Sequence, residues 1–466
     1  MDNSEFSKWS NRATDWSQNY LDTLRDRPVR AQVKPGDIRK QLPANAPEQP
    51  EDMATIFADF ERIIPPAMTH WQHPRFFAYF PTNASTPAMI AEQLVTTMSA
   101  QCMLWQTSPA ATELEGVVIE WLRDALALPS HFTGVLHDTA TTATFSAILT
   151  MRERTLEYQG LTKGMSGSAL RIYASAQTHS SIDKAVRLSG IGQDNLVKIP
   201  TDADFAMDVD ALRAAIIKDR ADGLRPAGIV ACVGGTSIGA IDNVAAVAAL
   251  AKEQGLMCHV DAAWAGSAML CPEFRYLWQG VEGADSIVFN PYKWLGAVSD
   301  CSVQFIADPV PQIRTLGLRP AYLETLGEEE VTNYNEWTIP LGRRFRSLKL
   351  WFLIRAYGLE GLRLRIRNHV KWIKELEAKF AANPDFHITT ESRLALFTFQ
   401  YAPKGGDADA LTARLLQKIN DDGRVYLTQT IHQGKFVIRM TAGHFDCTRA
   451  DVMCVYDTAT ELAATL

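Results

Sequence analysis

The chain has 466 residues, of which 47% are hydrophobic and 21% charged, which is typical of a globular protein with more than one domain. Its 46 Lys and Arg and 53 Asp and Glu give a formal net charge of −7 without a long basic run, which argues against nucleic acid or an anionic membrane as a partner. The amino terminus has no secretory pattern, no apolar run reaches a membrane span of roughly 20 residues, and the seven cysteines form no Cys-x-x-Cys pair or metal-site spacing. We therefore expect a cytoplasmic protein with reduced thiols that binds small molecules.

Residues 1 to about 75 combine helical periodicity with proline-rich interruptions. Trp16, Tyr20, Leu21 and Leu24 recur at helical spacing, whereas residues 41–50 contain three prolines. The segment has too few apolar residues to form a core of its own. We therefore expect an arm that folds against another part of the assembly.

Residues 70–82 contain five aromatic rings besides two histidines. An aromatic cluster is more often part of a core than of a pocket. This segment is punctuated by proline and has poor periodicity, which weakens the core interpretation.

Ser108 and Pro109 predict the start of a helix, because serine is a common N-cap and proline suits the first turn. Apolar residues then recur at helical spacing, and we expect all of them to face the core: Leu114, Val117, Val118, Trp121, Leu122 and Leu126. We interpret this helix as structural.

A threonine-rich stretch, residues 134–144, leads into an apolar helical segment. Small hydroxyl residues at a helix start offer backbone N–H groups, hydroxyl groups and the positive end of the helix dipole to a phosphate. An ordinary threonine-rich N-cap explains the pattern equally well, so both interpretations stay open from these residues alone.

Between about residues 170 and 306 the chain alternates apolar strands with helices, which predicts a mainly parallel sheet covered on both faces. The expected strands are residues 170–174, 228–233, 256–260, 286–290 and 301–306, and residues 243–254 form one of the helices. Ligands of such sheets bind at the carboxyl ends of the strands. His179, Thr236, Asp261, Asn290 and Lys293 all follow strands in this way.

Lys293 and Asp261 are the two charged side chains that most suggest chemistry. Lys293 follows an apolar strand within an uncharged run, where desolvation would lower its pKa and make its amine a nucleophile toward a carbonyl. Asp261 ends another expected buried strand and needs a cationic partner, such as the protonated pyridine nitrogen of pyridoxal phosphate. Alone, Lys293 is more simply a surface lysine, and Asp261 has a competing interpretation as a capping residue. Their position on successive strands of one sheet favours a pyridoxal phosphate site.

The carboxyl-terminal part begins with a long helix expected from residue 348 to about 380. Residues 394–400 and 435–440 resemble strands, and residues 407–419 a helix, which indicates a smaller α+β domain. Arg439 alternates with apolar neighbours, and a packed ion pair is a commoner role for it than a clamp on a substrate carboxylate.

Four motifs resemble the group II pyridoxal-phosphate-dependent amino-acid decarboxylases, and among these the aromatic L-amino-acid decarboxylases most of all. They are residues 179–185, 259–266, 290–295 and 340–351. The similarity extends from about Trp9 to about Arg449. The resemblance implies an α/β protein of fold type I, like aspartate aminotransferase, with a mainly parallel sheet in the large domain and a small carboxyl-terminal α+β domain.

The same resemblance implies a homodimer with active sites at the subunit interface. We expect three parts: residues 1–75 as a helical arm on the partner subunit, residues 76–350 as the large cofactor-binding domain, and residues 351–466 as the small domain.

The resemblance also implies a role for each cofactor residue. Lys293 would bond to pyridoxal 5'-phosphate (PLP), Asp261 would pair with its pyridine nitrogen, and His179 would stack on its ring. The other implied cofactor contacts are Thr139, Ala140, Thr141, Thr236, Ala263, Asn290 and Tyr292. Thr139 and Thr141 replace the serines of the family and keep the hydroxyl chemistry. Tyr292 replaces a common histidine.

Tyr322, in a polar and acidic stretch that is typical of a surface loop, matches the family tyrosine that returns a proton to the substrate after carbon dioxide leaves. The implied substrate contacts are Trp71, Tyr79, Phe80, Pro81, Thr82, Met103, His179 and Gly342. Met103 stands where animal members have an aromatic residue, so the shape of the substrate pocket differs there. An aromatic wall suits a flat aromatic side chain.

The resemblance thus implies decarboxylation of an aromatic L-amino acid to an arylalkylamine and carbon dioxide. Tryptophan, tyrosine, phenylalanine, DOPA and 5-hydroxytryptophan are not ranked by the sequence, because contacts of only about 1–3 kcal/mol discriminate them. An aromatic aldehyde synthase on the same scaffold is the main alternative, and Tyr322 and His179 argue against it. Histidine decarboxylase is disfavoured by Gly342, where the animal enzymes carry serine. An aminotransferase and a binding protein without activity are further alternatives.

Overall fold

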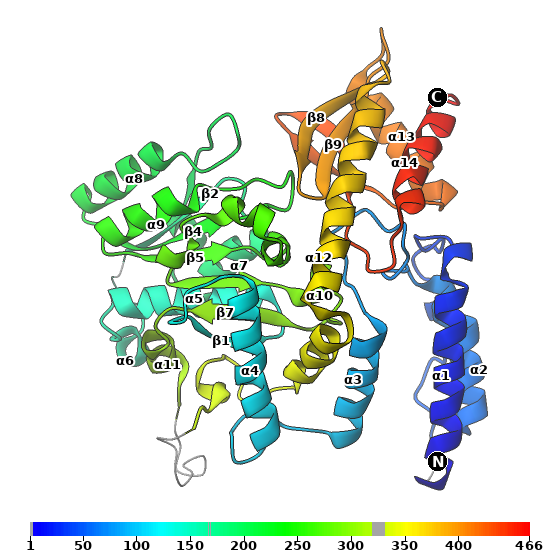
Figure 1. Cartoon of the computed structure of the whole chain (residues 1–466), viewed down its shortest axis with the longest axis horizontal. Coiled ribbons are helices and arrows are strands. Elements are labelled where there is room, and N and C mark those ends of the chain that lie inside the picture. Colours follow the sequence, from blue (N-terminus) through cyan, green and yellow to red (C-terminus); the bar gives the residue numbers. More distant parts are fainter. Residues whose placement is uncertain (1–2, 166, 168, 319–330) are drawn as a thin grey trace. The chain divides into compact units, whose positions relative to one another are not determined.

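The computed structural model describes residues 3–165, 167, 169–318 and 331–466, which divide into two compact units. Unit 1 comprises the residues up to Pro81 together with Trp372–Glu391 and Phe397–Leu466, and unit 2 comprises Thr82–Lys371 and Ser392–Leu396. Figure 1 labels the elements of both units. The division into an arm, a large domain and a small domain stays a prediction.

Unit 2 is built on a seven-stranded sheet with the order β1-β7-β6-β5-β4-β2-β3. The strands are β1 (Thr133–His137), β2 (Leu170–Ser175), β3 (Leu196–Ile199), β4 (Arg225–Cys232), β5 (Met257–Asp261), β6 (Ser286–Phe289) and β7 (Ser302–Ile306). Strands β2 to β6 pair in parallel, whereas β7 and β1 pair antiparallel at one edge. The predicted mainly parallel sheet is therefore confirmed, and β1 and β3 are strands that the sequence did not indicate.

Helices cover both faces of this sheet (Figure 1). On one face, α8 (Val209–Ala221) and α9 (Val244–Glu253) pack on β4, and on the other α5 (Ala140–Thr155) packs on β1 and on β4 to β7. A Cβ atom at Gly228 would lie 2.3 Å from Met151 Sδ, so α5 lies directly on the backbone of β4. The remaining short helices here are α6 (Gly160–Lys163), α7 (Ser180–Leu188), α10 (Pro291–Trp294) and α11 (Val310–Leu316).

Helix α4 (Pro109–Ala125) begins as predicted, with Ser108 at the N-cap and proline in the first turn. Val118, Leu122 and Leu126 are buried, but Val117 and Trp121 are 39% and 38% exposed. The prediction that all six apolar residues face the core was therefore wrong for these two. The preceding helix, α3 (Thr86–Met98), also leaves apolar side chains exposed.

Unit 1 combines the first residues of the chain with the carboxyl-terminal sheet, whose strand order is β10-β11-β9-β8. Its elements are α1 (Phe6–Asp22), α2 (Met53–Ile63), β8 (Phe386–Arg393), β9 (Leu396–Tyr401), α13 (Ala408–Asp422), β10 (Thr428–His432), β11 (Lys435–Thr441) and α14 (Arg449–Ala463). The buried carboxylate of Asp451 on α14 pairs with Arg25 and, at 3.0 Å, with Arg75. This carboxylate ties the amino-terminal segment to the carboxyl-terminal elements.

Helix α12 (Arg346–Ala381) confirms the long helix expected from residue 348, and it is kinked at Gly358, where φ is 63°. Among the described residues, no helix combines the length and the apolar composition that crossing a bilayer would require.

Candidate functional site

The residues predicted to follow parallel strands meet where β5 and β6 end. Asp261 is the last residue of β5 and lies opposite Val288 of β6 in the parallel register. The backbone N–H of Asn290, just after β6, donates to Ala263 O at 2.9 Å, so the two loops contact each other. Asp261 is only 6% exposed, and its Oδ1 accepts the Ala263 N–H at 3.0 Å. A buried carboxylate with one short backbone bond is suited to a cationic ligand.

Lys293 lies in the single turn of α10, directly beyond β6, and is half-buried. Its backbone N–H donates to Asn290 O at 3.0 Å, and its carbonyl accepts from Asn83 Nδ2 at 2.6 Å. The Asn83 N–H also donates to Tyr292 O at 2.9 Å. Asn83 therefore fixes the backbone of this turn and the point from which the amine extends.

His179 is the N-cap of α7, and its Nδ1 accepts from the Ser181 N–H at 3.1 Å. Although the side chain is exposed, partial desolvation lowers the pKa of His179, the charge of Lys293 lowers it further, and Asp261 opposes both effects. The charges of both residues thus act on His179, which caps the helix that follows β2. The neutral imidazole presents a flat face that can stack on an aromatic ring.

The loop after β4 contains two glycines that permit unusually close backbone contacts. A Cβ atom at Gly234, whose φ is +85°, would lie 2.6 Å from Ala265 Cβ, and one at Gly235 would lie 3.0 Å from Gln177 O. The loop therefore lies between the segment that leads to His179 and the segment after Asp261. This placement brings the half-buried Thr236 to the same edge of the sheet.

Helix α5 begins at the same edge, with Thr139 as its N-cap. The Thr139 side chain accepts from the Thr142 N–H at 3.4 Å. The N–H groups of Ala140 and Thr141 begin the helix and therefore have no acceptor within it, so they are available to an anion. Ala140 packs against Val288 of β6 and the partly buried Ala263, which places this helix start beside the loops of Asp261 and Asn290.

Asn290 and Tyr292 add two hydrogen-bonding side chains next to this helix start. Asn290 Nδ2 lies 3.2 Å from Tyr292 Oη, while Asn290 Oδ1 is buried without a partner among the described residues. If the amide turned by 180°, Tyr292 would donate to Oδ1 and Nδ2 could donate to an anion. Burial raises the pKa of Tyr292 to about 12, so its hydroxyl keeps its proton. These residues fit the phosphate of PLP, as Asp261 and Lys293 fit its ring nitrogen and carbonyl.

A buried histidine that the sequence did not single out connects this helix to the strands. His259 Nδ1 lies 2.6 Å from Ser286 Oγ on β6, and its Nε2 lies 3.1 Å from Thr144 Oγ1 on α5. Burial lowers the pKa of His259 to about 4, so the ring is neutral. The ring joins β5, β6 and α5 two residues before Asp261.

The predicted substrate residues fall into both compact units. In unit 1, Trp71 and Tyr79 are 39% and 44% exposed with ring centroids 5.9 Å apart, and Tyr426 lies 6.2 Å from Tyr79. Phe80 is buried and lies under the Arg439 guanidinium at 4.5 Å, and Pro81 is also buried. Two half-exposed rings suit a pocket wall better than a closed core. Neither Tyr426 nor this contact of Arg439 was predicted, because both residues lie more than 340 positions after the aromatic segment in the sequence.

Thr82, Met103, His179 and Gly342 lie in unit 2. Met103 O accepts the Asn335 N–H at 3.1 Å, and a Cβ atom at Gly342 would lie 3.2 Å from Gln101 Nε2, so the segments of Met103 and Gly342 are neighbours. Tyr322 lies outside the described residues.

Comparisons with known proteins identify the family of the chain. The family described as "Pyridoxal-dependent decarboxylase conserved domain" matches residues 35–402. The chain is 39% identical over 481 residues to the aromatic-L-amino-acid decarboxylase of Mus musculus, with 100% of this chain and 99% of the mouse protein covered. It is 37% identical to the phenylacetaldehyde synthase of Arabidopsis thaliana, with 95% and 92% covered.

A solved structure shows the same fold over the whole chain. The Catharanthus roseus tryptophan decarboxylase in complex with L-tryptophan matches with a TM-score of 0.94 and 35% sequence identity, covering 100% of this chain and 99% of that one. The alignments and the residues gathered at the strand ends agree: the chain belongs to the pyridoxal-dependent decarboxylase family and is a PLP-dependent carboxy-lyase.

Proposed function

We propose that this enzyme decarboxylates an aromatic L-amino acid to the corresponding arylalkylamine and carbon dioxide. The observation that carries the proposal is the arrangement of Asp261, His179 and Lys293 beside the anion-binding start of α5. The mouse and Catharanthus relatives are named for aromatic and tryptophan substrates, which supports an aromatic side chain here.

Each residue of the site has a defined task in this proposal. Bound PLP supplies a protonated pyridine ring that withdraws electrons from the substrate Cα. Asp261 would hold the proton on the ring nitrogen of PLP, and the amine of Lys293 would hold the cofactor through its carbonyl carbon. His179 would pack its flat imidazole against the ring. Thr139, Ala140, Thr141 and Asn290 hold the phosphate, with Thr236, Ala263 and Tyr292 as further contacts.

The substrate side chain is proposed to contact Trp71, Tyr79, Phe80, Pro81 and Thr82, together with Met103 and Gly342. Half-exposed aromatic rings favour a flat apolar side chain and disfavour a carboxylate, which would lose its hydration there without gaining a partner. This chemistry supports an aromatic amino acid over glutamate.

An aromatic aldehyde synthase is a second candidate, because the chain is 37% identical to one from Arabidopsis thaliana. We assign Tyr322 the return of a proton to the substrate Cα, which would retain the amine product. Incubation of the PLP-loaded enzyme in air with each aromatic amino acid and with histidine is expected to yield amine and carbon dioxide in equal amounts. Aldehyde and hydrogen peroxide as the main products of the unmodified enzyme would contradict the proposal.

A Tyr322→Phe variant is expected to shift the products toward aldehyde, ammonia and peroxide, because phenylalanine cannot supply the proton. The products are quantified in the same assay. Tyr276→Phe, which changes a 70% exposed tyrosine, is the matched control and is expected to keep the amine product. An amine yield in Tyr322→Phe equal to that of the control would contradict the role of Tyr322.

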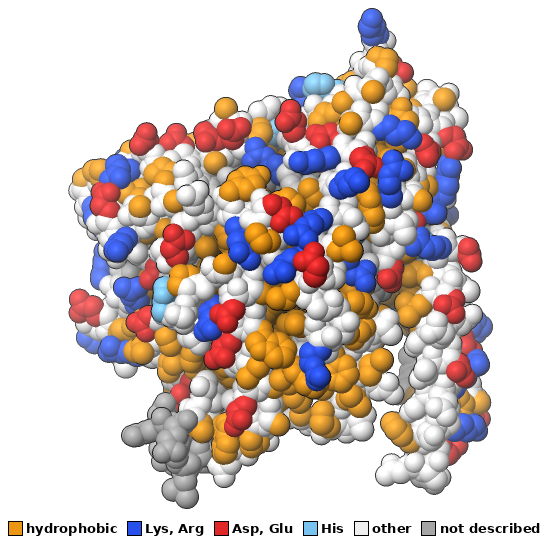
Figure 2. Space-filling model, in the orientation of Figure 1, with side chains coloured by type: hydrophobic (Ala, Val, Ile, Leu, Met, Phe, Trp, Pro, Cys, Tyr) orange, Lys and Arg blue, Asp and Glu red, His pale blue; other side chains and the backbone are white. Residues whose placement is uncertain are grey.

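We also infer a homodimer, because large apolar side chains stay exposed on neighbouring helices. Figure 2 shows hydrophobic side chains gathered on the part of unit 2 that carries α3 and α4. The exposed ones on these helices are Ile90, Leu94, Met98, Val117 and Trp121. Helix α1 has no buried residue, which fits an arm whose apolar side chains are covered by a partner subunit.

Light scattering on the unmodified enzyme is therefore expected to give twice the chain mass. The double change Leu94→Asp and Val117→Asp is expected to weaken dimerisation by about 100-fold or more, since it places charges in the interface. Ile217→Asp on α8, where the side chain is 57% exposed, is the control and should leave the mass unchanged. A monomeric unmodified enzyme would contradict the dimer.

A cytoplasmic location stays a prediction, supported by seven free cysteines.

A further inference from the structure

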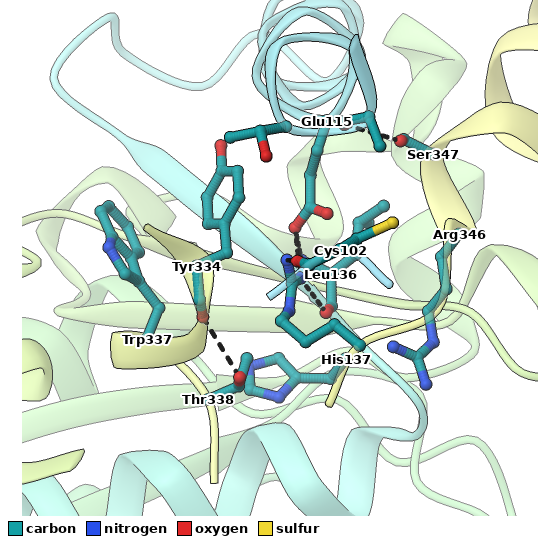
Figure 3. Close-up of polar contacts among 12 residues, drawn as sticks. Cys102, Glu115, Leu136, His137, Tyr334, Trp337, Thr338, Arg346 and Ser347 are labelled. Carbon is teal, nitrogen blue, oxygen red and sulfur yellow. Dashed lines mark hydrogen bonds and ion pairs between the residues drawn. The ribbon is translucent and has the colours of Figure 1, made fainter. Parts of the chain in front are cut away.

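Arg343 follows Gly342 and is almost completely buried, at 4% exposure. Its Nη2 donates to Glu115 Oε1 at 2.6 Å and to Leu136 O at 2.9 Å, and its Nη1 donates to Cys102 O at 3.4 Å. Figure 3 shows that Glu115, Leu136 and Cys102 lie close together. One guanidinium group thus connects α4, the end of β1 and the segment before α4.

Glu115 strengthens the connection to β1. Its carboxylate is also buried, and Oε1 accepts the Leu136 N–H at 2.9 Å in addition to its bond from Arg343. Both backbone groups of Leu136 are therefore held by this one ion pair. Because Leu136 lies three residues before Thr139, the pair fixes the strand end from which the proposed phosphate-binding turn begins.

The backbone of Arg343 holds the segment that contains Met103. Its N–H donates to Gln101 Oε1 at 2.7 Å, and its carbonyl accepts the Cys102 N–H at 2.9 Å. The Tyr334 ring lies 5.0 Å from the guanidinium, next to Asn335, whose N–H donates to Met103 O. The Met103 segment is therefore positioned through Arg343.

A small pocket lies beside Arg343 and is lined by residues next to Gly342 and by residues around the start of α5. Asp138 and Thr142, at the start of α5, line this pocket together with Gly342 and Arg343. The proposed specificity position Gly342 therefore faces the same space as Asp138 and Thr142, which flank the proposed phosphate turn on either side. A shift of Arg343 would move the backbone of Leu136 and the backbone of Cys102, because Arg343 bonds to both.

We propose that Arg343, held by Glu115, is a positioning residue that couples substrate selection by the Met103 segment to cofactor binding at the start of α5. The substrate part rests on the proposed function. The cofactor part depends only on PLP as the ligand of this family.

The first test replaces Arg343 with lysine, which keeps the positive charge but cannot reach Glu115, Leu136 and Cys102 with one planar group. The Kd for PLP, measured by absorbance titration, is expected to rise about tenfold, because small displacements of binding groups have large effects. The ratio of kcat/KM for tryptophan to kcat/KM for tyrosine is expected to change at least about fivefold. A residue with only a structural role would lower the Tm without changing this ratio.

Glu153→Gln is the matched control. Glu153 is a fully buried partner of Arg152 near the end of α5, and the described contacts of its side chain do not include the Met103 segment or the phosphate turn. Its replacement should lower the Tm and leave both the PLP affinity and the substrate ratio unchanged. Equal effects of Arg343→Lys and Glu153→Gln on both quantities would overturn the proposal.

Gln101→Ala is the second variant, for the case in which Arg343→Lys does not fold. The exposed Gln101 side chain accepts from the Arg343 N–H, so its removal loosens the Met103 segment while leaving the ion pair in place. We expect the substrate ratio to change about twofold to fivefold and the PLP Kd to stay within twofold. An unchanged ratio would overturn the coupling to the substrate segment. If the unmodified enzyme decarboxylates no aromatic amino acid, the proposed function fails, while the PLP titrations still decide the cofactor part.

Discussion

A Lys293→Ala variant is expected to lose decarboxylase activity, with kcat reduced by roughly 10⁴-fold or more. Alanine removes the amine that holds the cofactor carbonyl carbon but leaves the turn intact, because Asn83 bonds to the backbone of Lys293 and Tyr292. The visible absorbance band of the PLP-loaded protein should disappear at the same time. Activity and absorbance spectra are the two measurements.

Two further variants separate the possible causes of that loss. Lys293→Arg keeps the positive charge without a nucleophilic amine and should be as inactive as Lys293→Ala. Lys184→Ala removes an exposed lysine from α7, the helix that His179 caps, and should retain full activity. A visible band of full intensity in Lys293→Ala would show that another group binds the cofactor.

An Asp261→Asn variant is expected to lower kcat by roughly 10³-fold, equivalent to about 4 kcal/mol of transition-state stabilisation. Asparagine has nearly the same shape and can still accept the Ala263 N–H, but it has no charge to keep a proton on the pyridine nitrogen. The effect should appear mainly in kcat, because the phosphate contacts at Thr139 and Asn290 are unchanged. Steady-state kinetics at saturating PLP measure it.

Asp285→Asn is the control, because Asp285 lies just before β6 and contacts the opposite end of β5 from Asp261. Asp285 Oδ2 accepts the Cys258 N–H at 2.7 Å, next to the start of β5, so this change removes a comparable carboxylate far from the site. We expect a lower Tm and an unchanged kcat. If both aspartate variants reduced kcat equally, the charge of Asp261 would have no specific role.

Much of the sheet could be predicted, because its central strands are continuous apolar runs separated by helices. All five expected strands occur, and the charged residues that follow them meet at one edge. Strands β1 and β3, which were missed, are the two edge strands of the sheet. Edge strands of this kind leave little local signal.

Helix α4 shows what periodicity cannot decide. Its apolar residues recur at helical spacing, yet Val117 and Trp121 are exposed, because spacing does not distinguish a buried apolar face from an exposed one. Glu115 carried a usable signal, since it is a charged residue three positions before Val118 on the buried face. A buried charge within an apolar stripe indicates a partner such as Arg343.

The site residues were predicted mainly from their motifs, and the contacts that hold them were not. Asn83, which fixes the Lys293 turn, and His259, which joins α5 to β5 and β6, act through residues more than 100 positions away. Long-range hydrogen bonds of this kind follow from the fold and have no local pattern. The predicted roles of Tyr322 and of the substrate residues stay predictions.

Identification of the cofactor-bearing residue tests the account most directly. The PLP-loaded enzyme is reduced with borohydride, which makes the bond between cofactor and protein permanent, then digested and analysed by mass spectrometry. We expect one pyridoxyl group per chain, attached to the Nζ of Lys293 in the peptide that follows β6. Attachment to any other lysine, or a reduced protein without pyridoxyl, would contradict the assignment of this site.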